Sequence, residues 1–117
     1  MRVLVCGGRD FTNRDLLHRV LNDHHKRYGI TAIIEGNARG ADRLAGYWAR
    51  SNKIDNEKYP ANWKKYGKAA GPIRNQEMIT VGCPDIVIAF PGGKGTEDMI
   101  RKAEQANIST LSIVDRT

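Results

Sequence analysis

Glycine, arginine and aspartate gather in three short segments of the chain, and these residue types together suit the binding of an anion. The segments are GGRD at 7–10, GNARGAD at 36–42 and PGGKGT at 91–96. Glycines let backbone amides approach a ligand closely, and free amides at the start of a helix favour a phosphate. The alternative is that the glycines only form tight turns. The residues expected to contact the ligand through these segments are Gly7, Gly8, Gly36, Gly40, Gly92, Gly93, Gly95 and Thr96.

Three arginines accompany the glycines. Arg9 follows the first glycine pair, Arg39 lies in the second segment, and Arg74 is followed by Asn75 in GPIRNQEM. A guanidinium group binds phosphate or carboxylate by paired hydrogen bonds, so we expect these four side chains to contact an anionic ligand.

Carboxylates lie in the same segments, and each has a structural alternative to a role in chemistry. Asp42 and Asp98 fall in predicted first helical turns, where the helix dipole alone favours acidic residues. Asp10 follows Arg9, and Arg9 could pair with Asp10 or Asp42 without ever contacting a ligand.

The segment ANWKKYGKAAG at 61–71 interleaves Trp63 and Tyr66 with three lysines. It precedes Arg74, so it could overhang the site as a lid in which Trp63 stacks on a base. Aromatic and basic residues together also suit single-stranded nucleic acid. A third interpretation is a solvated loop in which Trp63 covers the edge of the sheet.

Several familiar motifs are missing. No GxGxxG follows the first predicted strand, GGKGT lacks the spacing of a Walker loop, and there is no GxSxG. Cys6 and Cys83 form no CxxC, so we expect neither zinc, nor a disulfide, nor a bound cofactor, and a reducing, cytoplasmic location. We also expect no signal peptide and no contact with a membrane, because no apolar run is long enough to span one.

The composition is that of a globular protein. The chain has 117 residues, of which 40% are hydrophobic and 27% charged, and this length suits one domain over residues 1–117. The formal net charge of +6 fits an anionic partner, and it also fits a basic protein without one. Self-association is left open by the sequence.

Strands and helices are predicted to alternate along the chain. The predicted strands are 2–6, 31–35, 54–59, 85–90 and 109–114, and 54–59 is polar enough to lie at a sheet edge. Thr12 is expected to cap the first helix, which reaches Tyr28 with His24 and His25 near the surface. The later helices contain 41–49, run from Pro72 towards Gly82, and span 96–106 with Ala106 facing inward.

This alternation predicts the α/β class: one Rossmann-like domain with a parallel sheet and helices on both faces. The simplest strand order is 3-2-1-4-5. The winding direction then reverses between strands 2–6 and 85–90, and ligands bind beyond the carboxyl ends of the strands at such a point. The glycine segments follow these ends, so all three should meet at one rim.

In this order and spacing, GGRDF, GNARGAD, GPIRN and FPGGKGTEDM resemble the YspA-like branch of the SLOG superfamily, which also includes LOG phosphoribohydrolases and DNA-processing members. The resemblance implies a Rossmann-like fold and a site for a nucleotide or nucleotide-derived ligand. It implies that the glycines and threonine of 92–96 hold the phosphate. It also implies that Arg74 matches the arginine that LOG enzymes use near the ribose.

One position departs from the LOG pattern PGGxGTxxE, because Met99 stands where the glutamate is expected. The departure favours a binding or sensing module. A nucleotide N-glycosidic or phosphoribosyl hydrolase is the first alternative, and its catalytic residues would be Arg74, Asp98 and Asp10. A nucleic-acid-binding protein is the second alternative.

Overall fold

The fold was analysed in a computed structural model that describes residues 1–116, in which strands and helices alternate. The strands are β1 (Arg2–Cys6), β2 (Ala32–Glu35), β3 (Asp55–Lys58), β4 (Ile86–Ala89) and β5 (Ser109–Ser112). The helices are α1 (Arg14–Tyr28), α2 (Ala41–Ser51), α3 (Trp63–Tyr66), α4 (Ala70–Thr80) and α5 (Lys94–Gln105), and a 3₁₀ turn, Gly67–Ala69, links α3 to α4.

The five strands form one parallel sheet in the order β3-β2-β1-β4-β5, as predicted. Val3 of β1 pairs with Ile33 of β2 on one side and with Ile86 of β4 on the other. The apolar run of β4 is covered on both faces, since Val87 and Ile88 are both fully buried. The polar strand β3 lies at an edge, also as predicted.

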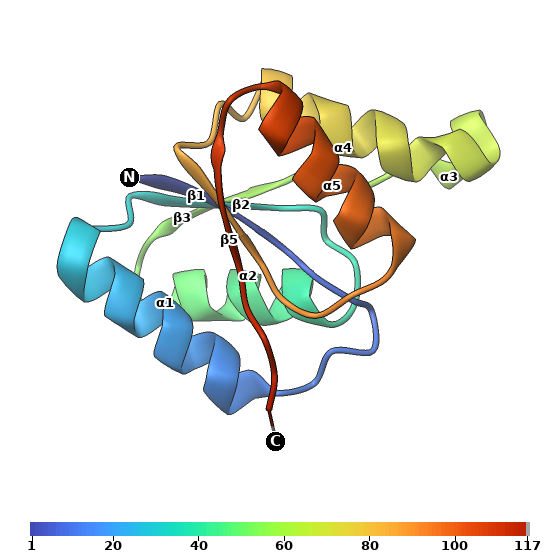
Figure 1. Ribbon diagram of the computed structural model, residues 1–117. Helices are drawn as coiled ribbons and strands as arrows, with labels where there is room; N and C mark the ends of the chain where they lie inside the picture. The colour runs from blue at the N-terminus through green and yellow to red at the C-terminus, as the bar shows by residue number, and fades with distance from the viewer. Residues whose placement is uncertain (117) are drawn as a thin grey trace.

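Helices cover both faces of the sheet (Figure 1). Helices α1 and α2 pack on one face, where Leu17, Leu21 and Trp48 belong to a buried cluster with β1 and β2. Helices α4 and α5 pack on the other face, where Met78 and Met99 contribute to a second cluster. Met99 is buried because it belongs to the inward stripe of α5, so it has no access to a ligand.

Several local predictions were wrong, three of them in α1 and at the end of α5. Asn13, not Thr12, caps α1, because the Asn13 side chain accepts a hydrogen bond from the Leu16 amide at 3.1 Å. His24 is buried, since it extends the apolar stripe of α1 and packs against Tyr28 with ring centroids 4.7 Å apart. Ala106 is exposed, because α5 ends at Gln105 and Ala106 lies beyond its last turn.

The segment predicted as a loop before Arg74 is largely helical. Asn62 accepts a hydrogen bond from the Lys65 amide at 3.1 Å and so caps α3, which leads through the 3₁₀ turn directly into α4. This arrangement sets α3 at the start of α4 (Figure 1), and Trp63, the first residue of α3, lies near Gly71 of α4. Helix α5 begins at Lys94, so Asp98 lies in its second turn rather than its first.

The amino end of the sheet carries a network around Arg2. Its guanidinium group donates to both carboxylate oxygens of Glu57 in β3, at 2.8 and 2.7 Å, and twice to the carbonyl of Gly82, at 3.0 and 2.6 Å. The Arg2 amide donates to Asp85 at 2.7 Å. Arg2 therefore ties β1, β3 and the turn before β4 together.

The cysteines are both free, as predicted. Cys6 ends β1 beside Ala89, whereas Cys83 precedes β4 at the opposite end of the sheet. No helix within residues 1–116 is both long and apolar enough to cross a membrane.

Candidate functional site

Backbone contacts hold the three predicted glycine loops together at the carboxyl end of the sheet. The Gly8 amide donates to the Pro91 carbonyl at 2.8 Å, and the Ala41 amide donates to the Gly8 carbonyl at 3.2 Å. Gly40 has φ of 85°, and a Cβ there would collide with the Gly8 carbonyl oxygen. A Cβ on Gly92 would collide with Thr96 Oγ1.

The glycines at the rim therefore divide into two groups. Gly7, Gly8, Gly36, Gly40 and Gly92 are packed so closely against protein atoms that a Cβ would lie within about 3 Å of them. Gly93 and Gly95 face open space, with no heavy atom within 4 Å of an added Cβ. The tight-turn interpretation thus accounts for the first group, and the second group is left available to a ligand.

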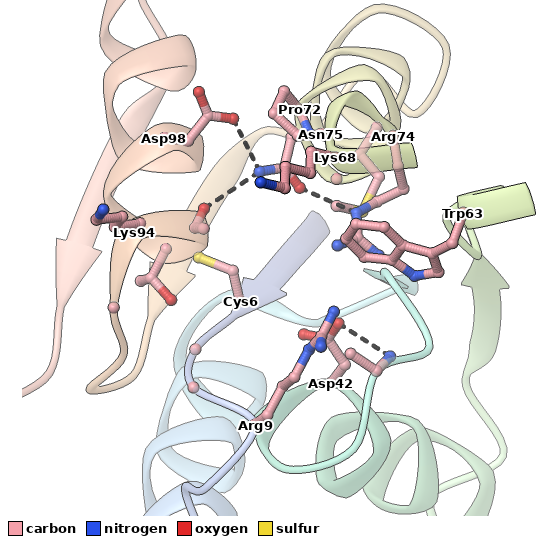
Figure 2. Close-up of a pocket in the computed structure, with 18 residues that line it drawn as sticks. Cys6, Arg9, Asp42, Trp63, Lys68, Pro72, Arg74, Asn75, Lys94 and Asp98 are labelled. Atoms are coloured by element: carbon pink, nitrogen blue, oxygen red, sulfur yellow. Dashed lines mark hydrogen bonds between the residues drawn. The ribbon is translucent and has the colours of Figure 1, made fainter. Parts of the chain in front are cut away.

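A cavity of about 500 Å³ opens where the winding direction reverses between β1 and β4. The end of β1, the start of α5, one face of α4 and the Trp63 ring form its walls (Figure 2). This volume lies within the range of small-molecule sites.

The start of α5 forms one wall through Gly93, Lys94, Gly95 and Thr96. The first amides of any helix have no partner within the helix, and no side chain caps this one. An anion placed there would meet these amides, the positive end of the helix dipole and the Lys94 ammonium group.

Asp98 lines the cavity but is held by three partners. It accepts hydrogen bonds from Asn75 Nδ2 at 3.0 Å, from Lys102 Nζ at 2.6 Å and from Arg101 at 2.9 Å. Burial raises its pKa, but Lys102, Asn75 and Arg101 outweigh this effect, so the pKa of Asp98 is lowered overall. Asn75 Nδ2 also donates to the Gly95 carbonyl at 3.2 Å, which ties α4 to the start of α5.

Arg74 and Asp42 face each other across the cavity floor (Figure 2). Arg74 Nη1 donates to the Gly36 carbonyl at 2.7 Å, and Asp42 accepts a hydrogen bond from the Ala38 amide at 3.2 Å. Burial raises the pKa of Asp42 to about 6, although the Ala38 amide and Arg74 oppose the rise. Asp42 therefore exchanges its proton near neutral pH while it faces the half-buried guanidinium group of Arg74.

Arg9 and Trp63 close the cavity on the side of β3. The Arg9 guanidinium carbon lies 5.3 Å from the Trp63 ring centroid, within the range of a cation–π contact. Trp63 is 47% exposed, so its ring is not a buried plug at the edge of the sheet. Both side chains are open to a ligand that enters the cavity.

Five predicted site residues lie outside the cavity, and all of the others line it. The five are Asp10, Gly36, Arg39, Gly40 and Gly92. The Asp10 side chain is 96% exposed and pairs with Arg39 at 3.1 Å, so it points away from the cavity that a catalytic role would require. Gly36, Gly40 and Gly92 shape the walls from behind.

The sequence analysis missed seven lining residues: Cys6, Ala38, Lys68, Gly71, Pro72, Met78 and Lys94. Cys6 directly precedes Gly7, and burial raises the pKa of its thiol to about 12, so it offers a neutral, weakly polar surface. Met78 lies one helical turn after Arg74, a spacing that places both on one face of α4. Within residues 1–116 no three metal-ligating side chains come together.

Fold and site define a Rossmann-like domain with a cleft at its topological switch point. The sequence profile described as the YspA, cpYpsA-related SLOG family matches residues 1–66. The Gene 61 protein of Mycobacterium phage D29 is 36% identical over 124 residues, which is 98% of this chain and 98% of the phage protein. The chain therefore belongs to the YspA, cpYpsA-related SLOG family.

The fold is also similar to a solved structure, that of DNA processing protein A (DprA) from Streptococcus pneumoniae. The TM-score is 0.75 at 18% sequence identity, and the match covers 97% of this chain. The chain spans about half of that protein, since the match covers 50% of it. At this identity the likeness supports the Rossmann-like fold.

Proposed function

We propose that this domain binds a nucleotide or a nucleotide-derived small molecule in the 500 Å³ cavity. The observation that carries the proposal is the meeting of two features in one cavity, the uncapped start of α5 and the exposed ring of Trp63. The first suits a phosphate group and the second suits the flat face of a base.

The remaining walls suit a sugar. Asp42 and Arg74 lie on the cavity floor between the start of α5 and Trp63 (Figure 2). A carboxylate accepts hydrogen bonds from hydroxyl groups, and a guanidinium group donates to hydroxyl or phosphate oxygens. A nucleotide with its phosphate at Gly93–Thr96 would place its ribose over these two side chains.

Binding without turnover fits the carboxylates best. Asp98 is ion-paired with its pKa lowered, Asp10 points away, and Arg74 stays protonated, so none of the three predicted catalytic residues is a free general base. Asp42 is the one carboxyl among the described cavity residues with a pKa raised towards neutrality. A hydrolase would therefore have to use Asp42.

The test is a thermal-shift and calorimetry screen with AMP, ADP and ADP-ribose. A ligand at about 100 times its dissociation constant should add about 2.7 kcal/mol to the free energy of unfolding. We expect Arg74→Ala to weaken binding by about 100-fold or more, because it removes a half-buried, charge-assisted contact. Arg19→Ala, an exposed arginine on α1 outside the cavity, is the matched control and should bind normally.

Two results would contradict the proposal. One is the absence of a shift with every nucleotide, and the other is normal binding by Arg74→Ala. Release of free base by the wild-type protein that is lost in Asp42→Asn would make the domain a hydrolase instead.

The likeness to DprA motivates a nucleic-acid ligand as the alternative. In that case single-stranded DNA should bind more tightly than a mononucleotide. The logarithm of its affinity should also fall with the logarithm of salt concentration, with a slope near −0.7 for each phosphate contacted. We expect the mononucleotide to compete and the DNA to bind weakly at physiological salt.

A further inference from the structure

A second pocket, of about 380 Å³, lies beside the cavity at the rim, between the loops that follow β2 and β3. Its wall holds four charged side chains, and all of them are arginines: Arg9, Arg39, Arg43 and Arg74. No carboxylate of the described chain lines it. The cavity at α5, by contrast, mixes cations with Asp42 and Asp98.

Direct ion pairs to these arginines are few among the described residues. Within residues 1–116, Arg9, Arg43 and Arg74 form no ion pair with a carboxylate. Arg39 pairs with Asp10 at 3.1 Å, but both side chains are largely exposed, so water weakens this pair. Burial lowers the pKa of Arg74, Asp42 and Glu35 raise it, and Arg9 lowers it, so the pKa of Arg74 is lowered overall.

The pocket is continuous with the cavity described above. Arg9, Ala38, Trp63 and Arg74 line both, so the Trp63 ring stands where the two meet. Strand order places the cavity at β1 and β4 and the pocket at β2 and β3. At about 4.8 Å between strands, their centres are about 10 Å apart along the rim.

We infer that the arginine pocket binds a second phosphoryl group of the same ligand, which would be a nucleotide with phosphates on both sides of its nucleoside. The inference rests on the proposed function, in which the first phosphate lies at α5 and the base lies against Trp63. A phosphoanhydride chain, as in ADP, keeps its charge on one side of the nucleoside. It cannot occupy both anion sites while the ribose lies between them.

The test compares AMP, ADP and adenosine 3′,5′-bisphosphate by calorimetry at constant ionic strength. We expect the bisphosphate to bind at least 10-fold more tightly than either AMP or ADP. Arg43→Ala should weaken the binding of the bisphosphate by about 10-fold and change the affinity for AMP less than 2-fold. The reason is that Arg43 lines the arginine pocket but not the 500 Å³ cavity. Arg50→Ala, an exposed arginine two turns later on α2, is the matched control and should change neither.

The outcomes separate this inference from the proposed function. Equal binding of AMP and the bisphosphate overturns the inference and leaves the proposed function standing. An equal gain for ADP, or an equal loss in Arg50→Ala, assigns the effect to general charge attraction and also overturns the inference. If a single-stranded oligonucleotide binds more tightly than the bisphosphate, the ligand is a nucleic acid rather than a small molecule, and the inference is overturned. No binding of any nucleotide overturns both.

Discussion

Arginine serves opposite purposes at the two ends of the sheet. At the amino end, Arg2 donates four hydrogen bonds to Glu57 and the Gly82 carbonyl, and so links β1, β3 and the turn before β4. At the carboxyl end, Arg9 and Arg43 lie at a concave surface without an ion pair among the described residues. The first arrangement stabilises the fold, and the second leaves positive charge free for a ligand.

The carboxyl groups show the same division. Glu57, the partner of Arg2 in β3, has a pKa lowered by its hydrogen bond with Arg2, so its charge is compensated in the folded protein. Asp42 and Glu35 at the carboxyl end have pKa values raised by burial. Buried carboxyl groups therefore destabilise the folded protein at the candidate site, whereas the ion pair of Arg2 stabilises it at the opposite end. Four substitutions can test this difference.

The largest effect on stability is expected at Asp42. Its pKa is about 6 in the folded protein against 3.8 in a free side chain, so the folded state holds the proton more tightly. The free energy of unfolding should therefore fall as pH rises from about 4 to about 6, by on the order of 3 kcal/mol. Urea unfolding of Asp42→Asn should not show this fall. The free energy of unfolding of the variant should therefore rise relative to that of the wild type as pH rises. A constant difference between the two proteins across this range would contradict the burial argument.

Arg2→Met should cost about 1–2 kcal/mol of unfolding free energy. The substitution leaves the Gly82 carbonyl and Glu57 without their donors, but both charged side chains are about one-third exposed, which limits the loss. Chemical denaturation measures the effect, and nucleotide affinity should stay unchanged. Weaker nucleotide binding in Arg2→Met would contradict the proposal that only the carboxyl end of the sheet contributes to binding.

Glu35→Gln should stabilise the protein at pH 8 and leave its stability unchanged at pH 4. Glu35 is fully buried, and its Oε2 has no hydrogen-bond partner among the described residues. Since burial raises the pKa of Glu35, the folded protein loses stability as pH rises through this group, and a neutral amide avoids the loss. The measurement is the midpoint of thermal unfolding at each pH. A variant less stable than the wild type at pH 8 would show that the charged form of Glu35 is needed.

Arg9→Ala should have the smallest effect on stability, within about 0.5 kcal/mol, because the side chain is exposed and its only partner among the described residues is the half-exposed Trp63 ring. Nucleotide affinity should nevertheless fall about 10-fold, since Arg9 lines both pockets. Stability and affinity can be measured in one thermal-shift titration. A destabilised Arg9→Ala with normal affinity would reverse the roles assigned to the two ends.

The sequence predicted the fold well because its signals are physical and local. The apolar runs of β1, β2 and β4 mark buried strands, and connection rules then leave few possible strand orders. The same rules predict that Arg74, Thr96 and Trp63 share one rim. Predictions at helix ends were weaker, because Thr12 and Asn13 are both good caps and packing decides between them.

The sequence could not separate glycines that pack from glycines that remain open. Gly92 and Gly93 are adjacent and identical in type, yet a Cβ would be blocked at the first and free at the second. Asp10 was placed at the site because its loop is there, but its side chain points outward to Arg39. Such distinctions depend on the direction of individual bonds, which residue spacing does not determine.

Gly8 binds the neighbouring loops by main-chain groups alone. Its amide and its carbonyl reach Pro91 and Ala41, respectively, so the rim keeps its shape without help from the side chains that project from it. Arg9, Arg39 and Trp63 can therefore be exchanged while the loop framework stays intact. The rim is thus open to redesign, and libraries randomised at these exposed positions should return folded domains with altered ligand preference.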